Sequence, residues 1–265
     1  MLNRVSEPRV APDGRSVAFT LRETDFTGNR GVKSVWKLDL TDKAAQAQRM
    51  TAPGANAWSA RWSPDSRTLY FLSNRSGSDQ LWSLTEGLGE ARQVTHLPLD
   101  IGSYRLSPDG RRLALSLAVF TDCADLACTK QRFTDRTASK ESGMVYDRLF
   151  VRHWDTWADG TRSQLFIADI AEDGTVASEP RLLTRNIDGD VPSKPDGDES
   201  EYAFAPDGKS VYFGVRIAGT SEPWSTNFDV YVVPIDAGAA PRNLTADNLA
   251  WDAYPTPSAD GRKLF

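Results

Sequence analysis

The chain has 265 residues and a formal net charge of −5, from 31 basic and 36 acidic side chains. These charges are mixed along the chain and form no basic stripe of the kind that tracks phosphates, so we expect no nucleic-acid partner. No apolar run approaches the roughly 18 residues of a membrane-spanning helix, so we expect no membrane partner. No apolar signal-peptide core opens the sequence, so the leader of an exported protein would lie outside it.

A short turn motif recurs five times along the chain. The clearest copy is Ser107-Pro108-Asp109-Gly110. In such a turn Pro fixes φ at the first corner, Asp bonds the backbone two residues on, and Gly accepts a positive φ. An apolar strand follows each copy, and the other four copies begin at Ala11, Ser63, Ala205 and Ser258.

A second block recurs between successive turns, an aromatic-rich strand followed by a strand that resembles Arg-x-Leu-Thr. One repeat is therefore four short strands. The turn aspartates are 52, 44, 98 and 53 residues apart, and three of these intervals lie near the roughly 40–50 residues of a propeller blade. The sequence predicts an all-β fold, a β-propeller of four-stranded blades, with four complete blades plus the start of a fifth in this chain.

The blades are predicted in chain order, and the first opens on its innermost strand. Eight Trp, seven Tyr and eleven Phe would fill the space between stacked sheets. The predicted blades span 5–52, 57–96, a third from about 103 that includes 182–184, roughly 198–245, and a fifth that opens at 252–257 and ends in its second strand. Because a strand is a poor place for a domain to stop, we expect residues 1–265 to be part of a longer propeller.

The 98-residue interval contains only one aromatic strand and one Leu-Leu-Thr strand. We therefore interpret it as a single blade that carries an insertion at about 118–160, with two blades as the alternative. From Thr121 to about Tyr146 the chain is polar, which predicts a long loop or a short exposed helix. Loops of this length in compact domains tend to be functional or disordered.

The only two cysteines, Cys123 and Cys128, lie five residues apart inside this insertion. They are a candidate disulfide, and the alternative is two unpaired thiols. A disulfide would favour a periplasmic or secreted protein, whereas free thiols would leave a cytoplasmic location open. Neither His96 nor His153 lies at ligand spacing from the pair, so no metal site is expected.

The densest aromatic and charged stretch is 145–157. It has two interpretations: a structural corner in which Trp154 and Trp157 pack between blades while Arg152 pairs with Asp155, or a cavity wall that contacts substrate or a partner domain. The candidates for substrate access or substrate contact are Glu141, Tyr146, Arg152, His153, Trp154 and Asp155.

Five carboxylates gather in residues 188–199, but they do not follow the alternating ligands of a calcium-binding EF-hand loop. A solvated acidic loop is the better interpretation, and no cofactor is expected. The chain contains no Gly-x-Ser-x-Gly nucleophile elbow, Walker loop or dinucleotide fingerprint. We therefore assign no catalytic residue to it.

Four features together resemble the N-terminal propeller of prolyl oligopeptidase family serine peptidases, in the acylaminoacyl-peptidase or dipeptidyl-peptidase V branch. They are the Pro-Asp-Gly blades, Asn3–Val10, Val151–Trp157 and Asp190–Pro195. The similarity covers essentially the whole chain. The turn alone is weak, because TolB-type propellers share it, whereas the Arg-His-Trp-Asp-Thr-Trp segment is much more specific.

The resemblance implies that the propeller sits over a C-terminal α/β-hydrolase domain, which is absent from this chain and would carry Ser, Asp and His. The parent protein would then be a serine exopeptidase that releases N-terminal dipeptides or acylated residues from short peptides, and this part would gate substrate access. Its partners would be peptide substrate and its own hydrolase domain, with self-association through open blade edges as a further possibility. The alternative is a non-enzymatic, TolB-like periplasmic propeller that holds a protein partner.

Overall fold

The computed structural model describes residues 3–87, 89–146, 149, 151–236 and 238–265. The chain divides into two compact units. The first runs to Ile101 and includes Ile170–Ala177, and the second contains Gly102–Asp169 and Ser178–Phe265. None of the helices in the described part is long and apolar enough to cross a membrane.

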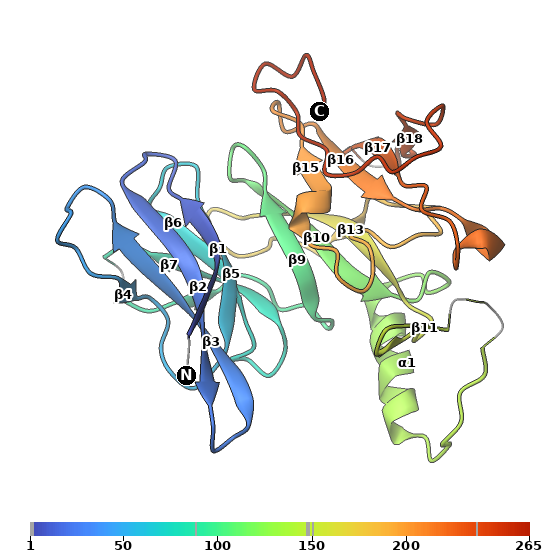
Figure 1. Ribbon diagram of the computed structural model, residues 1–265, viewed down its shortest axis with the longest axis horizontal. Helices are drawn as coiled ribbons and strands as arrows, with labels where there is room; N and C mark the ends of the chain where they lie inside the picture. The colour runs from blue at the N-terminus through green and yellow to red at the C-terminus, as the bar shows by residue number, and fades with distance from the viewer. Residues whose placement is uncertain (1–2, 88, 147–148, 150, 237) are drawn as a thin grey trace. The chain divides into compact units, whose positions relative to one another are not determined.

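The first unit contains two four-stranded antiparallel sheets (blue to cyan, Figure 1), in each of which consecutive strands pair in chain order. Short connections favour this arrangement because each strand turns back onto its neighbour. The strands of one sheet are β1 (Arg4–Val10), β2 (Ser16–Asp25), β3 (Arg30–Asp39) and β4 (Gln48–Arg49). Those of the other are β5 (Ala57–Trp62), β6 (Thr68–Ser73), β7 (Gln80–Thr85) and β8 (Arg92–Gln93).

The second unit has the same kind of sheet twice (green to orange, Figure 1). One consists of β9 (Ile101–Leu106), β10 (Arg112–Val119), β13 (Arg162–Asp169) and β14 (Arg181–Leu182). The other consists of β15 (Tyr202–Phe204), β16 (Ser210–Val215), β17 (Asp229–Pro234) and β18 (Arg242–Asn243), with the short 3-10 helices η1 (Glu199–Glu201) and η2 (Gly219–Ser221) nearby. Each of the first four predicted repeats forms one of these four-stranded sheets.

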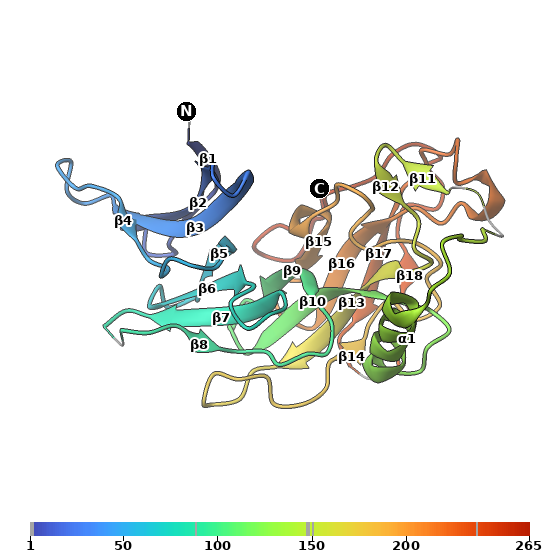
Figure 2. The ribbon, with the colours of Figure 1, turned by 90° about the horizontal axis from the view of Figure 1, so that it is seen from below.

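Residues 120–161 lie between the paired strands β10 and β13. They include α1 (Leu126–Ala138) and a small hairpin of β11 (Arg152–His153) and β12 (Thr156–Trp157). Figure 2 labels the helix and both strands of the hairpin. Of the two structures predicted for 121–146, the exposed helix is the one that forms. Asp147, Arg148 and Phe150 of the dense aromatic stretch lie outside the described residues.

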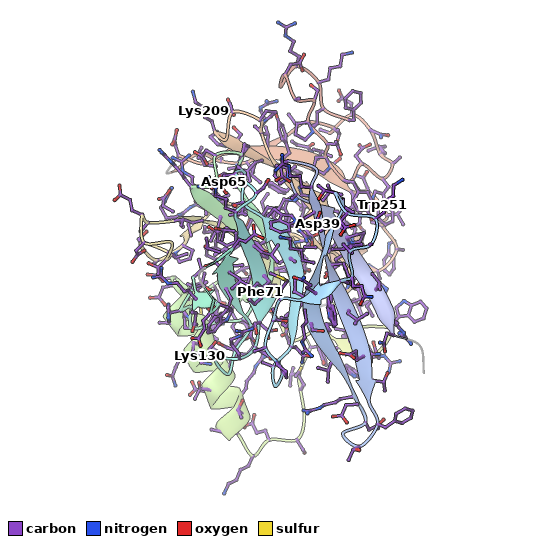
Figure 3. The ribbon with its side chains drawn as sticks, turned by 90° about the vertical axis from the view of Figure 1, so that its left-hand side faces the viewer. Asp39, Asp65, Phe71, Lys130, Lys209 and Trp251 are labelled. Atoms are coloured by element: carbon purple, nitrogen blue, oxygen red, sulfur yellow. A yellow bond between two sulfur atoms is a disulfide. The ribbon has the colours of Figure 1, made fainter. Side chains whose placement is uncertain are left out.

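All five predicted turns have the same hydrogen bonds. In each, the fourth residue donates its N–H to the carbonyl of the first, at 2.8–2.9 Å, and Oδ1 of the aspartate accepts the N–H two residues on, at 2.9–3.1 Å. Glycine takes a φ near +70° in four copies, and Ser66 takes +63° in the fifth. Figure 3 labels Asp65 of that copy and Phe71, which is fully buried in the strand that follows the turn.

The recurring threonine also has a local cause. The outermost strand of each sheet is only two residues long, and a threonine just beyond it receives the next backbone N–H of the neighbouring strand on its Oγ1 atom. These threonines are Thr51, Thr95, Thr184 and Thr245, with N–H···Oγ1 distances of 2.9–3.1 Å. The threonine hydroxyl thus replaces a backbone carbonyl as the acceptor at the end of the outer strand, and the N–H of the neighbouring strand is not left unpaired.

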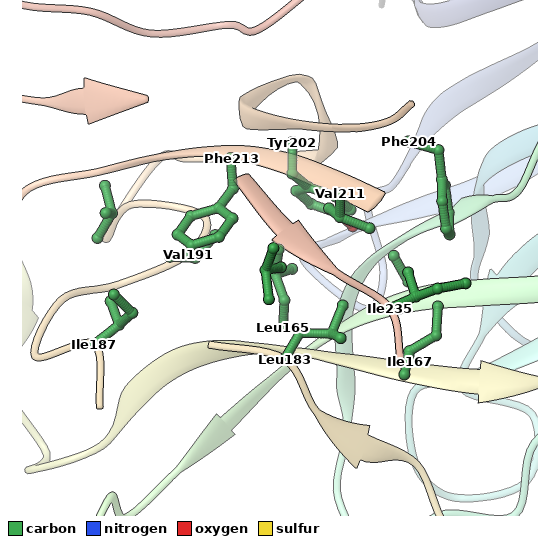
Figure 4. Close-up of a cluster of buried hydrophobic side chains, with 13 residues drawn as sticks. Leu165, Ile167, Leu183, Ile187, Val191, Tyr202, Phe204, Val211, Phe213 and Ile235 are labelled. Atoms are coloured by element: carbon green, nitrogen blue, oxygen red, sulfur yellow. The ribbon is translucent and has the colours of Figure 1, made fainter. Parts of the chain in front are cut away.

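Each unit has its own hydrophobic core. In the first, Ala18, Val35, Leu69 and Phe71 are central. The second has a larger cluster in which Leu165, Tyr202 and Phe213 are fully buried (Figure 4). In the described part of 249–265 no regular strand forms, although Thr256 and Phe265 exchange two backbone hydrogen bonds at 2.9 and 3.0 Å. The opening of the predicted fifth blade is therefore a short hairpin.

Candidate functional site

Two cavities of the second unit border the segment 120–161. The larger has a volume of about 1060 Å³ and is lined by the start of α1, the chain before the hairpin, and residues 179–188. The smaller has a volume of about 260 Å³ and lies between the hairpin, β13 and the loop that contains Lys194. Residues of this segment line both cavities, so the contacts that hold the segment against the sheets also shape the cavities.

Two arginines of helix α1 hold it against the aromatic ring of Phe120. The guanidinium groups of Arg132 and Arg136 lie 5.0 and 4.9 Å from the centre of the Phe120 ring. Arg132 also donates to both carboxylate oxygens of Asp122, at 2.7 and 2.6 Å, and this hydrogen bonding lowers the pKa of Asp122. Arg136 donates to the carbonyl of Asp159 at 2.5 Å, which links α1 to the chain beside both cavities.

The start of α1 is closed by a disulfide. Cys123 and Cys128 are joined, with their Cα atoms 5.6 Å apart. Asp125 caps the helix between them, because its carboxylate accepts the Cys128 N–H at 2.7 Å. Cys123 itself lines the larger cavity, so the crosslink fixes part of that cavity's wall.

The hairpin carries an aromatic and cationic stack. Arg152 is the cross-strand partner of Trp157, and its guanidinium lies 5.2 Å from the centre of the indole. Tyr146 stacks on the same indole, with ring centres 6.1 Å apart and planes 29° apart. The backbone reverses at Trp154, whose φ of +52° is rare for a residue with a side chain.

The structural-corner interpretation of this stretch is wrong. Trp154 is 83% exposed and Trp157 is 56% exposed, and in the described chain Arg152 interacts with the indole of Trp157 and not with Asp155. A high local density of aromatic residues predicts burial only where a surface lies opposite them, and here a two-residue turn presents Trp154 to solvent.

A charge network lies between the two cavities, since Arg162 and Glu222 line both of them. Arg162, at the start of β13, donates to Asp190 Oδ2 at 2.9 Å, to both oxygens of Glu222 at 3.1 Å, and to Asp188 Oδ1 at 3.4 Å. Burial opposes the charge of Arg162, but the hydrogen bonds to Glu222 and the charge of Asp190 outweigh it and raise the pKa of Arg162. Arg162 is therefore permanently charged and held by bidentate pairing.

The network continues through Lys194. Its Nζ donates to the carbonyl and to Oγ1 of Thr161, at 3.0 and 2.8 Å, and lies 3.6 Å from Asp190 Oδ1. That same Asp190 oxygen accepts the Ser163 N–H at 2.7 Å. The expectation of a solvated acidic loop at 188–199 is thus wrong for Asp190, whose side chain is only 11% exposed.

Thr161 and Lys194 also affect the pKa of the neighbouring Asp159. Burial alone would raise the pKa of Asp159, but hydrogen bonds from the Thr161 side chain and backbone and the nearby charge of Lys194 lower it. Asp159 is therefore ionised at neutral pH. No group of three or more His, Cys, Asp or Glu side chains in the described chain is placed to hold a metal ion.

The structure separates the six sequence-predicted site residues. Arg152 and His153 line the smaller cavity, and Tyr146 lines the larger one. Glu141, Trp154 and Asp155 are exposed and line neither. The structure thus brings Tyr146 and Arg152 together on Trp157, places His153 at the smaller cavity, and leaves Glu141, Trp154 and Asp155 at the surface.

Sequence reasoning missed the residues that shape the smaller cavity: Arg162, Lys194, Arg216, Glu222 and Phe228. One signal was available, because Lys194 lies between two prolines in a segment already chosen for its resemblance. Nothing local marks Arg162 and Glu222, which are 60 residues apart.

A β-propeller is built from repeated antiparallel meanders of four strands, and the four sheets of this chain have that form. Solved structures of peptidases have a similar fold. Acylaminoacyl peptidase in complex with Z-Gly-Gly-Phe-chloromethyl ketone aligns over 99% of this chain and 35% of that chain, with a TM-score of 0.63 and 17% identity. Uncomplexed Pyrococcus horikoshii acylaminoacyl peptidase aligns over the same shares, with a TM-score of 0.62 and 17% identity. At this identity the likeness shows the fold.

Curated relatives point to the same group of proteins. Dipeptidyl-peptidase 5 of Porphyromonas endodontalis is 29% identical over 264 residues, which is 98% of this chain and 36% of the relative. Dipeptidyl-peptidase 5 of Porphyromonas gingivalis is 28% identical over 265 residues, 99% of this chain and 37% of the relative. No protein-family model matches the chain.

The resemblance to the propeller of prolyl oligopeptidase family peptidases is therefore confirmed. The chain spans little more than a third of the length of the relatives it matches.

Proposed function

We propose that this chain is the gating propeller of a serine exopeptidase that releases N-terminal dipeptides or acylated residues from short peptides. The observation that carries the proposal is the 29% identity to dipeptidyl-peptidase 5 of Porphyromonas endodontalis, which extends over 98% of this chain. The chain has no nucleophile elbow, so catalysis would belong to an α/β-hydrolase domain in another part of the polypeptide.

In this proposal residues 1–265 form one partial propeller domain. Its four sheets are four complete blades, the hairpin at 256–265 opens a fifth, and the segment at about 118–160 is an insertion in the third. A propeller channel admits extended chains and excludes folded ones because its width is set by packed sheets. The gate would select short or unfolded peptides on size.

The insertion would line the path of the peptide. Its two cavities are open to a chain end, and the stack of Tyr146, Trp157 and Arg152 offers both a flat apolar surface and a cation. His153 would contact substrate inside the smaller cavity, and the exposed Glu141, Trp154 and Asp155 would meet the peptide or the hydrolase domain first.

The disulfide between Cys123 and Cys128 supports a periplasmic or secreted location, because such bonds persist in oxidising compartments. We also propose that the isolated chain self-associates through its open blade edges, where the edge strand β1 also exposes Val5 and Val10.

The test is the gene beyond codon 265 and the complete protein that it encodes. We expect further Pro-Asp-Gly repeats and a Gly-x-Ser-x-Gly segment followed by Asp and His. The complete protein should cleave dipeptidyl or N-acyl-aminoacyl chromogenic substrates, should lose this activity when that serine becomes alanine, and should leave a folded protein intact. A reading frame that stops within one more blade would contradict the proposal and favour the non-enzymatic, TolB-like propeller.

A further inference from the structure

We propose that the smaller cavity is a binding site for the carboxylate of a peptide, with Arg152 as the residue that receives it and Trp157 and Phe228 as its apolar walls. This inference deepens the proposed function, because it names a chemical group of the peptide that the gate would recognise. Its evidence is the distribution of hydrogen-bond donors and acceptors around the cavity.

Most carboxylate oxygens of the cavity already accept hydrogen bonds. Both oxygens of Glu222 accept from Arg162, and Asp190 accepts from Arg162 through one oxygen and from the Ser163 N–H through the other. Asp159 accepts from the backbone and side chain of Thr161 through Oδ1. A ligand amine would therefore compete with existing hydrogen bonds at five of these six carboxylate oxygens, all but Oδ2 of Asp159.

The guanidinium of Arg152, by contrast, has no carboxylate partner in the described chain. No carboxylate of the described residues lies within ion-pairing distance of Arg152, and its guanidinium interacts with the Trp157 indole alone. This contact with the ring face uses none of the N–H donors of the guanidinium, so they stay available to a ligand. An arginine in this arrangement can receive both oxygens of a carboxylate at once.

A second donor faces the cavity from another segment. Arg216 lies over the Phe228 ring at 5.4 Å and uses one nitrogen for the carbonyl of Ser225, at 3.0 Å. Its other terminal nitrogen forms an ion pair with Glu222, whose Oε1 lies 3.7 Å away, too far for a hydrogen bond. Arg216 therefore adds a second guanidinium to the cavity, one whose charge is shared with Glu222, whereas Arg152 has no carboxylate partner in the described chain.

The size and walls of the cavity fit a chain end. Its volume of about 260 Å³ corresponds to roughly nine water molecules in the liquid, which is room for a terminal residue and too little for a folded partner. Trp157, Phe228 and Pro195 give it apolar surface, which an inorganic anion would not use. Carboxylate and apolar side chain together describe the end of a peptide better than a free ion.

The test is calorimetric binding of three peptides to the chain. Ala-Ala-Phe carries a terminal carboxylate, Ala-Ala-Phe-amide does not, and Ala-Ala-Glu-amide carries a side-chain carboxylate alone. Because hydrogen bonds to charged groups contribute roughly 1.5–3 kcal/mol, we expect the free acid to bind at least tenfold more tightly than its amide. Tight binding of the Glu amide as well would show that the site reads any carboxylate and not only the terminal one.

Three variants test whether Arg152 is the residue that binds the carboxylate. Arg152 is exposed, so Arg152→Ala should keep the fold, and it should reduce the affinity for the free acid to that of the amide. Arg111→Ala removes the same charge from an exposed turn outside both cavities and should leave the affinity unchanged. Trp157→Ala should weaken binding as well, since the guanidinium then loses its platform.

The inference fails if acid and amide bind equally, if neither binds, if Arg152→Ala keeps the preference, or if inorganic phosphate binds as tightly as the peptide acid. These binding measurements need no catalysis. A peptidase whose propeller ignores the carboxylate would contradict this inference alone, whereas a reading frame without a hydrolase domain would contradict the proposed function alone.

Discussion

Single residues decide how the turns of this protein respond to pH. Ser107 donates its hydroxyl to Asp109 Oδ1 at 2.5 Å and accepts the Arg112 N–H at 2.9 Å. The same pair of bonds occurs at Ser63 and Ser258, whereas the copies at Ala11 and Ala205 lack the hydroxyl. The serine hydroxyl, followed by the backbone N–H of Arg111, lowers the pKa of Asp109.

We predict that Ser107→Ala destabilises the fold by about 1 kcal/mol at neutral pH, the contribution of one intramolecular hydrogen bond. Because the folded state lowers the pKa of Asp109, its charged form adds stability above the unfolded pKa of roughly 3.9, and this is lost as the pH falls through the folded value. The difference between protein and variant should therefore shrink on acidification. Urea unfolding at pH 7 and pH 3 measures both.

The matched control for this prediction is Ala205→Ser, which adds the hydroxyl to a copy of the turn that lacks it. It should stabilise the fold or leave it unchanged. An equal loss of stability in both variants would mean that the side chain's packing, and not the hydroxyl, sets the effect.

At the scale of one element, the outermost strands depend on a side chain. Thr184 is 1% exposed; its Oγ1 accepts the Leu165 N–H at 3.0 Å and donates to Gln164 Oε1 at 2.6 Å. Gln164 in turn donates to the carbonyls of Ile187 and Gly189. Through this chain of bonds the end of β14 fixes the loop that leads to Asp190.

Thr184→Val keeps the shape and removes the hydroxyl, so it leaves a buried N–H and a buried amide oxygen without a partner. We expect a loss of about 2 kcal/mol, within the range for unsatisfied buried groups. Thr245→Val is the control, because Thr245 is only half-buried and bonds the backbone alone, and it should cost clearly less. Thermal unfolding of the two variants compares them directly, and equal losses would show that the Gln164 bond adds nothing.

At the scale of the whole molecule, the sequence predicts what is local. The turns and the positions of the outer strands follow from Pro, Asp, Gly and Thr within a few positions of one another, so all four sheets could be located in advance, although the outer strands are only two residues long. The charge network could not, since Arg162 and Glu222 meet only after β13 and the chain beyond β16 have folded. Exposure of Trp154 was also out of reach, because residue type alone does not say whether a surface lies opposite.

The self-association proposed above belongs to this scale. Apolar side chains are exposed near both ends of the chain: Val5, Val10, Leu249, Trp251, Tyr254 and Phe265. Apolar surface of this kind favours contact with another copy. We expect light scattering to show a mass that rises with concentration, and Leu249→Asp with Phe265→Asp to lower it.

Val145→Asp is the control for those substitutions, since Val145 is 95% exposed but lies in the insertion. It should leave the association unchanged. A monomer at all concentrations would contradict the expectation.

Val119 and Arg162 face each other as the last residue pair of β10 and β13. The chain therefore leaves the sheet and returns to it at one point, as close as the two ends of a tight hairpin. Such an attachment makes the whole segment between them a replaceable cassette: it can be lengthened, shortened or exchanged in evolution or by design while the register of the sheet stays the same. Arg162 is the residue at which the chain re-enters the sheet. An exchanged segment of any length would therefore end beside the same charge network of Arg162, Asp190 and Glu222.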